Sequence, residues 1–561
     1  MKIIIYRLGL GLLLCYSPIL AEAQWDKVPS SLATQIDAIF EDYEEEPGCA
    51  LGVFHKGKII YQKGYGYANL DYGIEVSPST IFETASISKQ FTAACVLHLE
   101  DQGLIGLDDS IHKYFPELPH YKEGPITIRQ LLHHTSGLRD YLILLQVMGK
   151  SWDMTYTNDE GFDLLARQKT LCFAPGTKYG YSNSGYLLLA EIVERTSGKS
   201  LAAYAQKHLF EPLGMNKTFI YQDAKQIVKD RAIGYAPGAS GFEREHYFNF
   251  ISEGDGGVQT NIVDFFKWSE NLKNNRLPIK NFTNRMLQRG RLNNGDTIPY
   301  ALGLEHAVHM GSSLYAHNGM WGGNRSMFLQ FPEEDLSILT LSNNGAQNVW
   351  QKAYQVASVM LEEATSPTST SPAATYLPPK TIVLSPKKLS SFCKDYFDFE
   401  SGLSRRIYLK NDTLQYYRGP GNESPLLPIA ENQFVMGGTA VDLRITFESN
   451  PSEGEIMLVR VNLGTTYKHV AYEKPDYTPQ EWTSFTGSFY SPELNTQYEI
   501  SHREGQLELS TDGEVFARWS PAMKNTFRDD HFGYITFDPS RNGFILTEES
   551  VGKLQFTRGK I

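Results

Sequence analysis

Hydrophobic and polar positions alternate along the chain with two different periods. Over residues 86–102 the apolar side chains of Ile87, Phe91, Cys95 and Leu99 recur at every fourth position. Because an α-helix turns once in about 3.6 residues, this spacing gathers them on one helical face. The pattern predicts a helix over this stretch.

Short apolar runs elsewhere predict β-strands. Residues 51–61 contain two such runs around a Lys-Gly turn, which is typical of a hairpin. Residues 327–331 and 337–341 form a second pair, separated by a turn of proline and acidic residues. Strands joined by short turns pair antiparallel, so we predict an α+β domain with an antiparallel sheet flanked by helices.

The C-terminal third of the chain repeats itself at an offset of 93 residues. Seven identical pairs share this offset: Ser391/Ser484, Phe392/Phe485, Ile407/Ile500, Leu414/Leu507, Pro428/Pro521, Asn432/Asn525 and Phe434/Phe527. Both copies contain short alternating runs between Gly, Asn and Asp turn residues. We therefore expect two small all-β barrel-like modules, residues 381–475 and 476–561, with no catalytic constellation of their own.

The N-terminus has the composition of a secretory signal peptide. A basic start precedes an apolar stretch over residues 8–20, and Ala21-Glu22-Ala23 is a small-x-small cleavage signature. The apolar stretch is shorter than the roughly 20 residues that span a membrane, and Pro18 interrupts it. We expect residues 1–23 to be removed on export, which gives a periplasmic or secreted protein without a membrane span. Lipidation at Cys15 is a minor alternative.

Residues 364–380 are rich in Pro, Ser and Thr, a composition that cannot bury a core. They are predicted to link a hydrolase domain, residues 24–363, to the two repeats. The chain carries 52 basic and 64 acidic side chains, a net charge of −12, so no nucleic-acid partner is expected. Without a Cys-x-x-Cys pair, or a carboxylate next to His133 and His134, neither a metal site nor another cofactor is predicted. The oligomeric state stays open.

The first candidate for chemistry is Ser86, with Lys89 three residues later. On a helix this spacing places both side chains on one face, where the amine can take the proton of the serine. Ser-x-x-Lys is a weak signal alone, since it recurs at Ser110, Ser385, Ser391 and Ser550. The copy at Ser86 differs because it opens an apolar helix.

Two further motifs support this assignment. Tyr181 and Asn183 lie in a turn just before a predicted helix, which would display a phenol and a carboxamide together. Beside a cationic lysine the phenol can lose its proton and act as a base. His317 and Gly319 come at the end of a predicted strand, where the glycine would let a substrate lie close to the backbone.

The order Ser-x-x-Lys, Tyr-x-Asn, His-x-Gly resembles serine hydrolases of the penicillin-binding-protein and class C β-lactamase type, which include D-aminopeptidases and esterases. Residues 126–138, 210–215 and 254–258 extend the resemblance, which covers roughly residues 30–360. It implies a β-lactamase/transpeptidase-like fold, with an all-helical subregion beside the sheet. The two C-terminal modules resemble the pair of barrels that follows the catalytic domain of D-aminopeptidases.

The resemblance also implies a mechanism. Ser86 would form an acyl-enzyme with an amide or ester, plausibly a D-amino-acid peptide or a β-lactam. Lys89 and Tyr181 would share the proton transfer, with the formal base left open, and Asn183, His317 and Gly319 would bind substrate. The backbone amides of Ser86 and Met320 would form the oxyanion hole.

One departure from the family pattern bears on the substrate. His317 stands where class C β-lactamases carry a lysine, and a neutral imidazole attracts a substrate carboxylate less than an ammonium does. This disfavours an efficient antibiotic-destroying enzyme. A short-chain esterase and a true β-lactamase remain alternatives within the enzymes, and a silent protein that binds cell-wall fragments is an alternative of another class.

Overall fold

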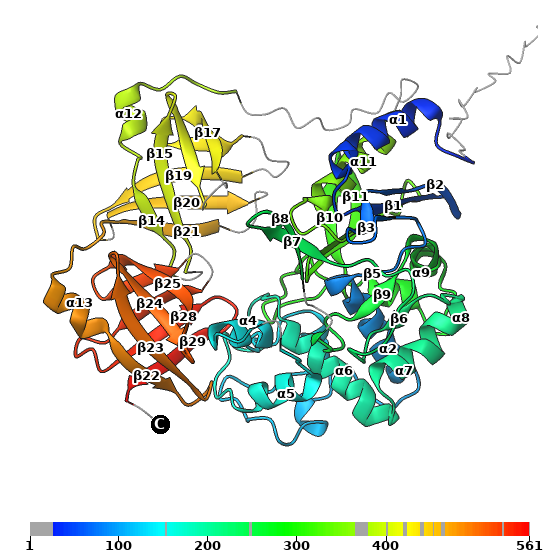
Figure 1. Cartoon of the computed structure of the whole chain (residues 1–561), viewed down its shortest axis with the longest axis horizontal. Helices are drawn as coiled ribbons and strands as arrows, with labels where there is room; N and C mark the ends of the chain where they lie inside the picture. Colours follow the sequence, from blue (N-terminus) through cyan, green and yellow to red (C-terminus); the bar gives the residue numbers. More distant parts are fainter. Residues whose placement is uncertain are drawn as a thin grey trace, which may run out of the picture.

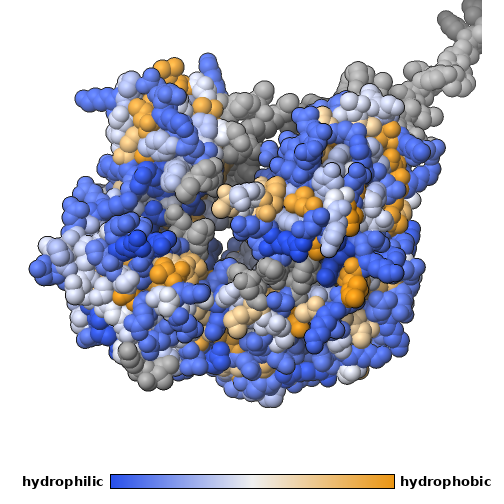
Figure 2. All heavy atoms as spheres, viewed as in Figure 1, coloured by the Kyte–Doolittle hydropathy of each residue, from blue (hydrophilic) through white to orange (hydrophobic). Residues whose placement is uncertain are grey.

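The computed structural model describes residues 26–151, 154–245, 249–364, 380–399, 402–418, 423–437, 443–452, 454–461, 466–529 and 532–559. The predicted signal peptide and residues 365–379 of the predicted linker lie outside these ranges. Among the described residues, no helix is both long and apolar enough to cross a membrane. The face in Figure 2 is mainly hydrophilic, with hydrophobic side chains in small separate groups.

A six-stranded antiparallel sheet forms the centre of the N-terminal unit, residues 26–364 (Figure 1). Its strands lie in the order β10 (Glu305–His309), β11 (Ser312–Trp321), β12 (Asn324–Phe331), β13 (Leu336–Ser342), β1 (Cys49–His55) and β2 (Lys58–Tyr65). The predicted hairpin is β1 and β2, and the second predicted pair is β12 and β13. Pairing of β1 with β13 joins the two ends of the unit.

Helices cover both faces of this sheet, as the α+β prediction requires. On one face α1 (Ser30–Ile39) and α11 (Val349–Ala364) pack over an apolar cluster that includes Ile36, Leu51, Ile338 and Val356. The other face carries α9 (Ile262–Asn274), which packs on β1 and β13. The remaining short strands are β3 (Tyr67–Asn69), β4 (Ile74–Glu75), β5 (Phe82–Glu83), β6 (Phe219–Ile220), β7 (Tyr235–Gly238), β8 (Gly241–Arg244) and β9 (Val258–Thr260).

The predicted helical subregion is built around α6 (Asn183–Ser197). This helix packs against α2 (Lys89–Asp101), α3 (Ile128–Leu132), α4 (Tyr141–Val147), α5 (Asn158–Ala166) and α7 (Leu201–Ala205). The two short helices α8 (Glu211–Leu213) and α10 (Phe282–Met286) complete the unit. The helix expected from residue 86 begins as a 3-10 turn, Ala85–Ser88, and continues as α2.

Helix α2 is more deeply buried than its apolar spacing predicts. Every residue from Lys89 to Leu99 is buried, including the polar ones. The buried polar side chains have partners: Gln90 accepts a hydrogen bond from Trp268, and Thr92 donates to the carbonyl of Gly254. The helix that carries the candidate lysine is therefore fixed on all sides.

The C-terminal repeats form two closed eight-stranded barrels, which confirms the all-β prediction. The first contains α12 (Pro386–Ser390) and strands β14 (Asp395–Phe397), β15 (Ser404–Lys410), β16 (Thr413–Tyr417), β17 (Glu423–Ala430), β18 (Gln433–Met436), β19 (Leu443–Asn450), β20 (Gly454–Val461) and β21 (Thr466–Tyr472). The second contains α13 (Pro479–Phe485), β22 (Gly487–Ser491), β23 (Thr496–Arg503), β24 (Gln506–Thr511), β25 (Glu514–Met523), β26 (Thr526–Asp529), β27 (Gly533–Phe537), β28 (Gly543–Glu548) and β29 (Gly552–Arg558). Some repeated residues are buried in their own barrels, for example Phe392 in the first and Phe485 in the second.

The second barrel lies against the helical subregion, beside α4 (Figure 1). Its apolar residues Tyr498, Val551 and Phe556 belong to the same buried cluster as Leu145 and Val147 of α4. The hydroxyl of Tyr498 also donates a hydrogen bond to the carbonyl of Val147. The N-terminal unit and this barrel therefore share one hydrophobic core.

Candidate active site

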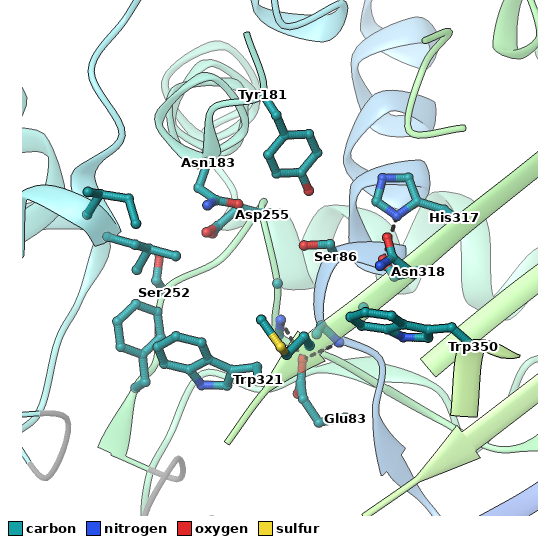
Figure 3. Close-up of a pocket in the computed structure, with 18 of the residues that line it drawn as sticks. Glu83, Ser86, Tyr181, Asn183, Ser252, Asp255, His317, Asn318, Trp321 and Trp350 are labelled. Atoms are coloured by element: carbon teal, nitrogen blue, oxygen red, sulfur yellow. Dashed lines mark hydrogen bonds between the residues drawn. The ribbon is translucent and has the colours of Figure 1, made fainter. Parts of the chain in front are cut away.

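One cavity of about 490 Å³ gathers the residues that the sequence motifs select. Six of the seven predicted site residues line it: Ser86, Tyr181, Asn183, His317, Gly319 and Met320. They come from the 3-10 turn before α2, the start of α6 and strand β11. In Figure 3 the side chains of Tyr181, Asn183 and His317 lie around Ser86. The seventh, Lys89, is fully buried directly beneath Ser86.

The backbone immediately before Ser86 is held in an unusual conformation. Ala85 has φ 49°, in the left-handed region that residues with a Cβ seldom adopt. The buried carboxylate of Glu83 holds this turn, because its Oε1 accepts hydrogen bonds from the backbone N–H of Ala85 at 3.1 Å and of Gly257 at 3.0 Å. Burial raises the pKa of Glu83 to about 7.

Lys89 is hydrogen-bonded to three different segments of the site. Its Nζ donates to Ser86 Oγ at 3.1 Å, to Asn183 Oδ1 at 2.9 Å and to the carbonyl of Asp255 at 2.8 Å. Burial lowers the pKa of Lys89 to about 8, although the carboxylates of Asp255 and Asp140 act in the opposite direction. A sizeable fraction of this amine is therefore neutral near pH 7 to 8 and able to accept a proton.

Tyr181 lies close to the same amine, with its ring centre 5.0 Å from Lys89 Nζ. Burial raises the pKa of the Tyr181 phenol well above its ordinary value, and a hydrogen bond with Ser86 only partly offsets this. The sequence leaves the formal base open between Lys89 and Tyr181, and desolvation of the phenol disfavours a deprotonated Tyr181. The geometry suits a phenol that passes on a proton rather than one that starts as a base.

Asn183 is oriented by its two neighbours. Lys89 Nζ donates to Asn183 Oδ1, so Nδ2 lies on the other side of the carboxamide and donates to Asp140 Oδ2 at 2.9 Å. The backbone N–H of Asn183 donates to the same oxygen of Asp140 at 2.7 Å. One hydrogen of Nδ2 is left for a substrate carbonyl.

His317 lies inside β11, which continues four residues beyond it to Trp321 rather than ending there as predicted. Its Nδ1 lies 2.6 Å from the carbonyl of Asn318 and its Nε2 lies 2.9 Å from the hydroxyl of Tyr300. The carbonyl can only accept, so Nδ1 carries the hydrogen and Nε2 accepts from Tyr300. Burial lowers the pKa of His317 to about 3, so the ring is neutral and both nitrogens are occupied.

Gly319 serves protein packing more directly than substrate access. A Cβ at this position would lie 2.2 Å from the carbonyl oxygen of Thr84 and 2.4 Å from Ser326 Oγ. The glycine therefore lets β11 approach the turn that presents Ser86. Beyond Ala316 this edge of β11 is not paired with β10, and the backbone near Met320 borders the cavity.

Sequence reasoning missed the charge and the aromatic wall of the cavity. Its lining includes the carboxylates of Glu83, Asp255 and Glu305, and none of its described residues is a lysine or arginine. Burial raises the pKa of Asp255 to about 6. On the opposite side, the rings of Phe250 and Trp321 pack 4.5 Å apart. Asp255 and Trp321 had a sequence signal, since Asp255 lies in the family-like stretch 254–258 and Trp321 follows the His-x-Gly motif.

The part of the chain that the structure describes contains no group of three His, Cys, Asp or Glu side chains that could hold a metal ion. His133 and His134 lie at the end of α3 and in the loop after it. Both are buried, and desolvation lowers the pKa of each. They pack as neutral rings, His134 against Tyr181.

Comparison with known proteins places the chain in a family. The family model described as Beta-lactamase matches residues 36–359, more than half of the chain. Penicillin-binding protein 4* of Bacillus subtilis (strain 168) is 30% identical over 313 residues, which are 53% of this chain and 68% of that protein. A D-aminopeptidase of Gluconobacter oxydans (strain 621H) is 28% identical over 361 residues, 64% of this chain and 65% of the relative.

Solved structures share the fold at lower identity. The octameric penicillin-binding protein homologue from Pyrococcus abyssi has a TM-score of 0.55 at 21% identity, over 79% of this chain and 99% of that chain. The D-amino acid amidase from Ochrobactrum anthropi SV3 has a TM-score of 0.52 at 22% identity, over 59% and 99% respectively. The family match and the fold agree with the resemblance seen in the motifs: this chain belongs to the beta-lactamase family and is a serine hydrolase.

Proposed function

We propose that the protein hydrolyses amides or short peptides whose N-terminal residue is a D-amino acid with a free amino group, through an acyl-enzyme on Ser86. The observation that carries this substrate class is the charge of the cavity. Three carboxylates line it, from Glu83, Asp255 and Glu305, without a lysine or arginine among its described lining residues. Above the raised pKa values of these acids, about 6 for Asp255 and about 7 for Glu83, such a lining is negatively charged, attracts an ammonium group and repels a carboxylate. The D-aminopeptidase relatives support the same class.

The chemical steps follow from the contacts of Ser86. Neutral Lys89, 3.1 Å from Ser86 Oγ, takes the hydroxyl proton while the oxygen attacks the substrate carbonyl carbon. The negative charge that develops on the carbonyl oxygen is stabilised by the backbone amides of Ser86 and Met320. Tyr181 passes the proton from Lys89 to the leaving amine, and the C–N bond breaks. Water then attacks the ester carbonyl carbon and the C–O bond to Ser86 breaks. One proton of the water returns to Ser86 Oγ through Lys89, and the D-amino acid leaves.

The apolar part of the cavity lining suits an apolar acyl side chain. Phe250 and Trp321 form an aromatic surface, and the lining also includes Leu142, Ile143 and Met320. Burying a side chain of the size of leucine or phenylalanine on such a surface contributes about 1.5–3 kcal/mol. We propose a preference for D-residues with large apolar side chains over D-alanine.

The esterase and β-lactamase alternatives use the same acyl-enzyme as an aminopeptidase. The charge of the substrate therefore distinguishes the three activities. β-Lactams and D,D-peptides carry a carboxylate beside the scissile bond, and the described lining offers it no cation. His317 is neutral, and its two nitrogens already have partners. We therefore rank both below an aminopeptidase or amidase activity.

The substrate proposal predicts strong discrimination by the amino group. N-acetylation of D-phenylalanine p-nitroanilide is expected to lower kcat/KM roughly 10- to 100-fold, because it removes a charged partner of the carboxylates. Steady-state kinetics on the free and acetylated amides measure this. Glu305→Gln is the variant to compare, since Glu305 lies at the cavity rim and removing its charge should shrink the difference. Equal or faster turnover of the acetylated amide would contradict the proposal.

We also propose that the protein is exported after removal of residues 1–23. The basic start, the apolar stretch and the Ala21-Glu22-Ala23 signature support this. An extracytoplasmic location would bring the enzyme to peptides that contain D-amino acids.

A further inference from the structure

Residues 139–141 connect the second barrel to the catalytic turn. On the barrel side, the guanidinium of Arg139 is 2% exposed and donates to Glu493 at 2.6 Å and to the carbonyl of Lys553 at 2.7 Å. The backbone N–H of Asp140 donates to the carbonyl of Ser550 at 2.8 Å. A buried arginine needs such partners. The barrel therefore helps to fix the position of this segment, together with Gln168 and Thr170 of the N-terminal unit, which accept from the same guanidinium at 2.8 Å.

On the other side, the same segment is bonded to the start of α6. Asp140 Oδ2 accepts from both the backbone N–H and the Nδ2 of Asn183, at 2.7 Å and 2.9 Å. Ser184 Oγ donates to the carbonyl of Arg139 at 2.6 Å. The same Ser184 Oγ accepts from the backbone N–H of Tyr141 at 2.8 Å. These bonds fix the carboxamide of Asn183 relative to the segment.

Asn183 transmits this orientation to the reacting groups, because its Oδ1 accepts from Lys89 Nζ at 2.9 Å. A continuous chain of hydrogen bonds therefore runs from the barrel carbonyl of Ser550 through Asp140 and Asn183 to Lys89. Asp140 lies outside the set of residues that line the cavity. It has no direct access to substrate and can act only through its neighbours.

The charge of Asp140 matters as well as its position. The charged or titratable groups that face Lys89 are the carboxylates of Asp255 and Asp140, the imidazoles of His134 and His317, and the rings of Tyr181 and Tyr186. The two carboxylates raise the pKa of Lys89, whereas burial lowers it. Removing one carboxylate therefore lowers the pKa of Lys89 further.

We propose that Asp140 is a positioning residue that orients Asn183 and sets the charge environment of Lys89, and that the second barrel holds Asp140 in place through Glu493 and Ser550. This inference rests on the proposed role of Ser86 and Lys89. It gives the second barrel a catalytic purpose, although none of the described cavity residues comes from it.

The test is the rate at which a serine-reactive fluorophosphonate labels Ser86 in the full chain, measured from pH 6 to 10. Asp140→Asn keeps the shape of the side chain but removes its charge and offers an N–H to the donors of Asn183. We expect the limiting rate at high pH to fall roughly 100-fold, because misplacement of about 1 Å has that effect. The midpoint of the profile is expected to move to lower pH.

Glu493→Ala and Tyr498→Phe each remove side-chain contacts between the second barrel and the N-terminal unit. Glu493→Ala removes those with Arg139 and with the backbone N–H of Lys169, and Tyr498→Phe removes the one with the carbonyl of Val147. Glu493→Ala should lower the limiting rate and the midpoint in the same direction as Asp140→Asn. Tyr498→Phe, whose partner Val147 lies outside residues 139–141, should change neither while lowering the thermal midpoint.

Two outcomes would overturn the inference alone: wild-type rate and midpoint in Asp140→Asn, or identical pH profiles for Glu493→Ala and Tyr498→Phe. A wild-type protein that the reagent does not label would instead contradict the proposed function, and this inference with it.

Discussion

Replacing Ser86 with alanine is expected to lower kcat for a D-aminoacyl amide by roughly 10⁴-fold or more, since without the hydroxyl no acyl-enzyme forms. The fold should persist, because the loss of one oxygen at the cavity surface leaves Lys89 bonded to Asn183 and to the carbonyl of Asp255. Steady-state kinetics with matched thermal melting measure both effects.

The sequence provides a control for this substitution. Ser391 begins another Ser-x-x-Lys, but it is exposed in the first barrel, where Lys394 pairs with Glu455. Ser391→Ala should leave kcat unchanged. Turnover by Ser86→Ala within tenfold of the wild type would place the nucleophile elsewhere.

Lys89→Met is expected to lower the rate of Ser86 acylation by about 10²- to 10⁴-fold, the usual contribution of a general base. Methionine fills similar volume but accepts no proton. The carboxylates of Asp255 and Asp140 would also lose their cationic neighbour, so some loss of thermal stability should accompany the kinetic effect. Single-turnover acylation measures the chemical step, and Lys394→Met in the first barrel is the control.

The same role of Lys89 predicts a pH dependence with a definite sign. Its pKa is lowered to about 8 by burial, and only the neutral amine, which predominates above that pH, accepts the serine proton. The acylation rate of the wild type should therefore rise with pH through a midpoint near 8. A rate that falls over this range, or an unchanged profile in Lys89→Met, would contradict the assignment.

Local patterns in the sequence predicted those parts of the site that adjoin helix and strand starts. Ser86 and Lys89 are three residues apart on one turn, and Asn183 is the first residue of α6. Local spacing alone therefore indicates that these side chains can face a common site. The hairpins and the repeated barrels were predictable for the same reason, because their pairing is between neighbours in the chain.

The parts that could not be predicted depend on contacts between distant residues. Glu83 and Gly257 form a hydrogen bond although they are 174 positions apart in the sequence, and Arg139 and Glu493 do so at a separation of 354. No periodicity marks such pairs, because only the folded chain brings them together. The protonation state of Tyr181 could not be predicted for a similar reason: its pKa depends on desolvation by residues that the local motif does not contain.

The central claim is that Ser86 carries an acyl group during turnover. The most direct measurement is the intact mass of the protein quenched milliseconds to seconds after mixing with a D-phenylalanine ester, followed by peptide mapping. We predict an added mass of one D-phenylalanyl group on the peptide that contains Ser86, absent from Ser86→Ala. Hydrolysis of the ester without any adduct at Ser86, or an adduct that persists in Ser86→Ala, would contradict the account.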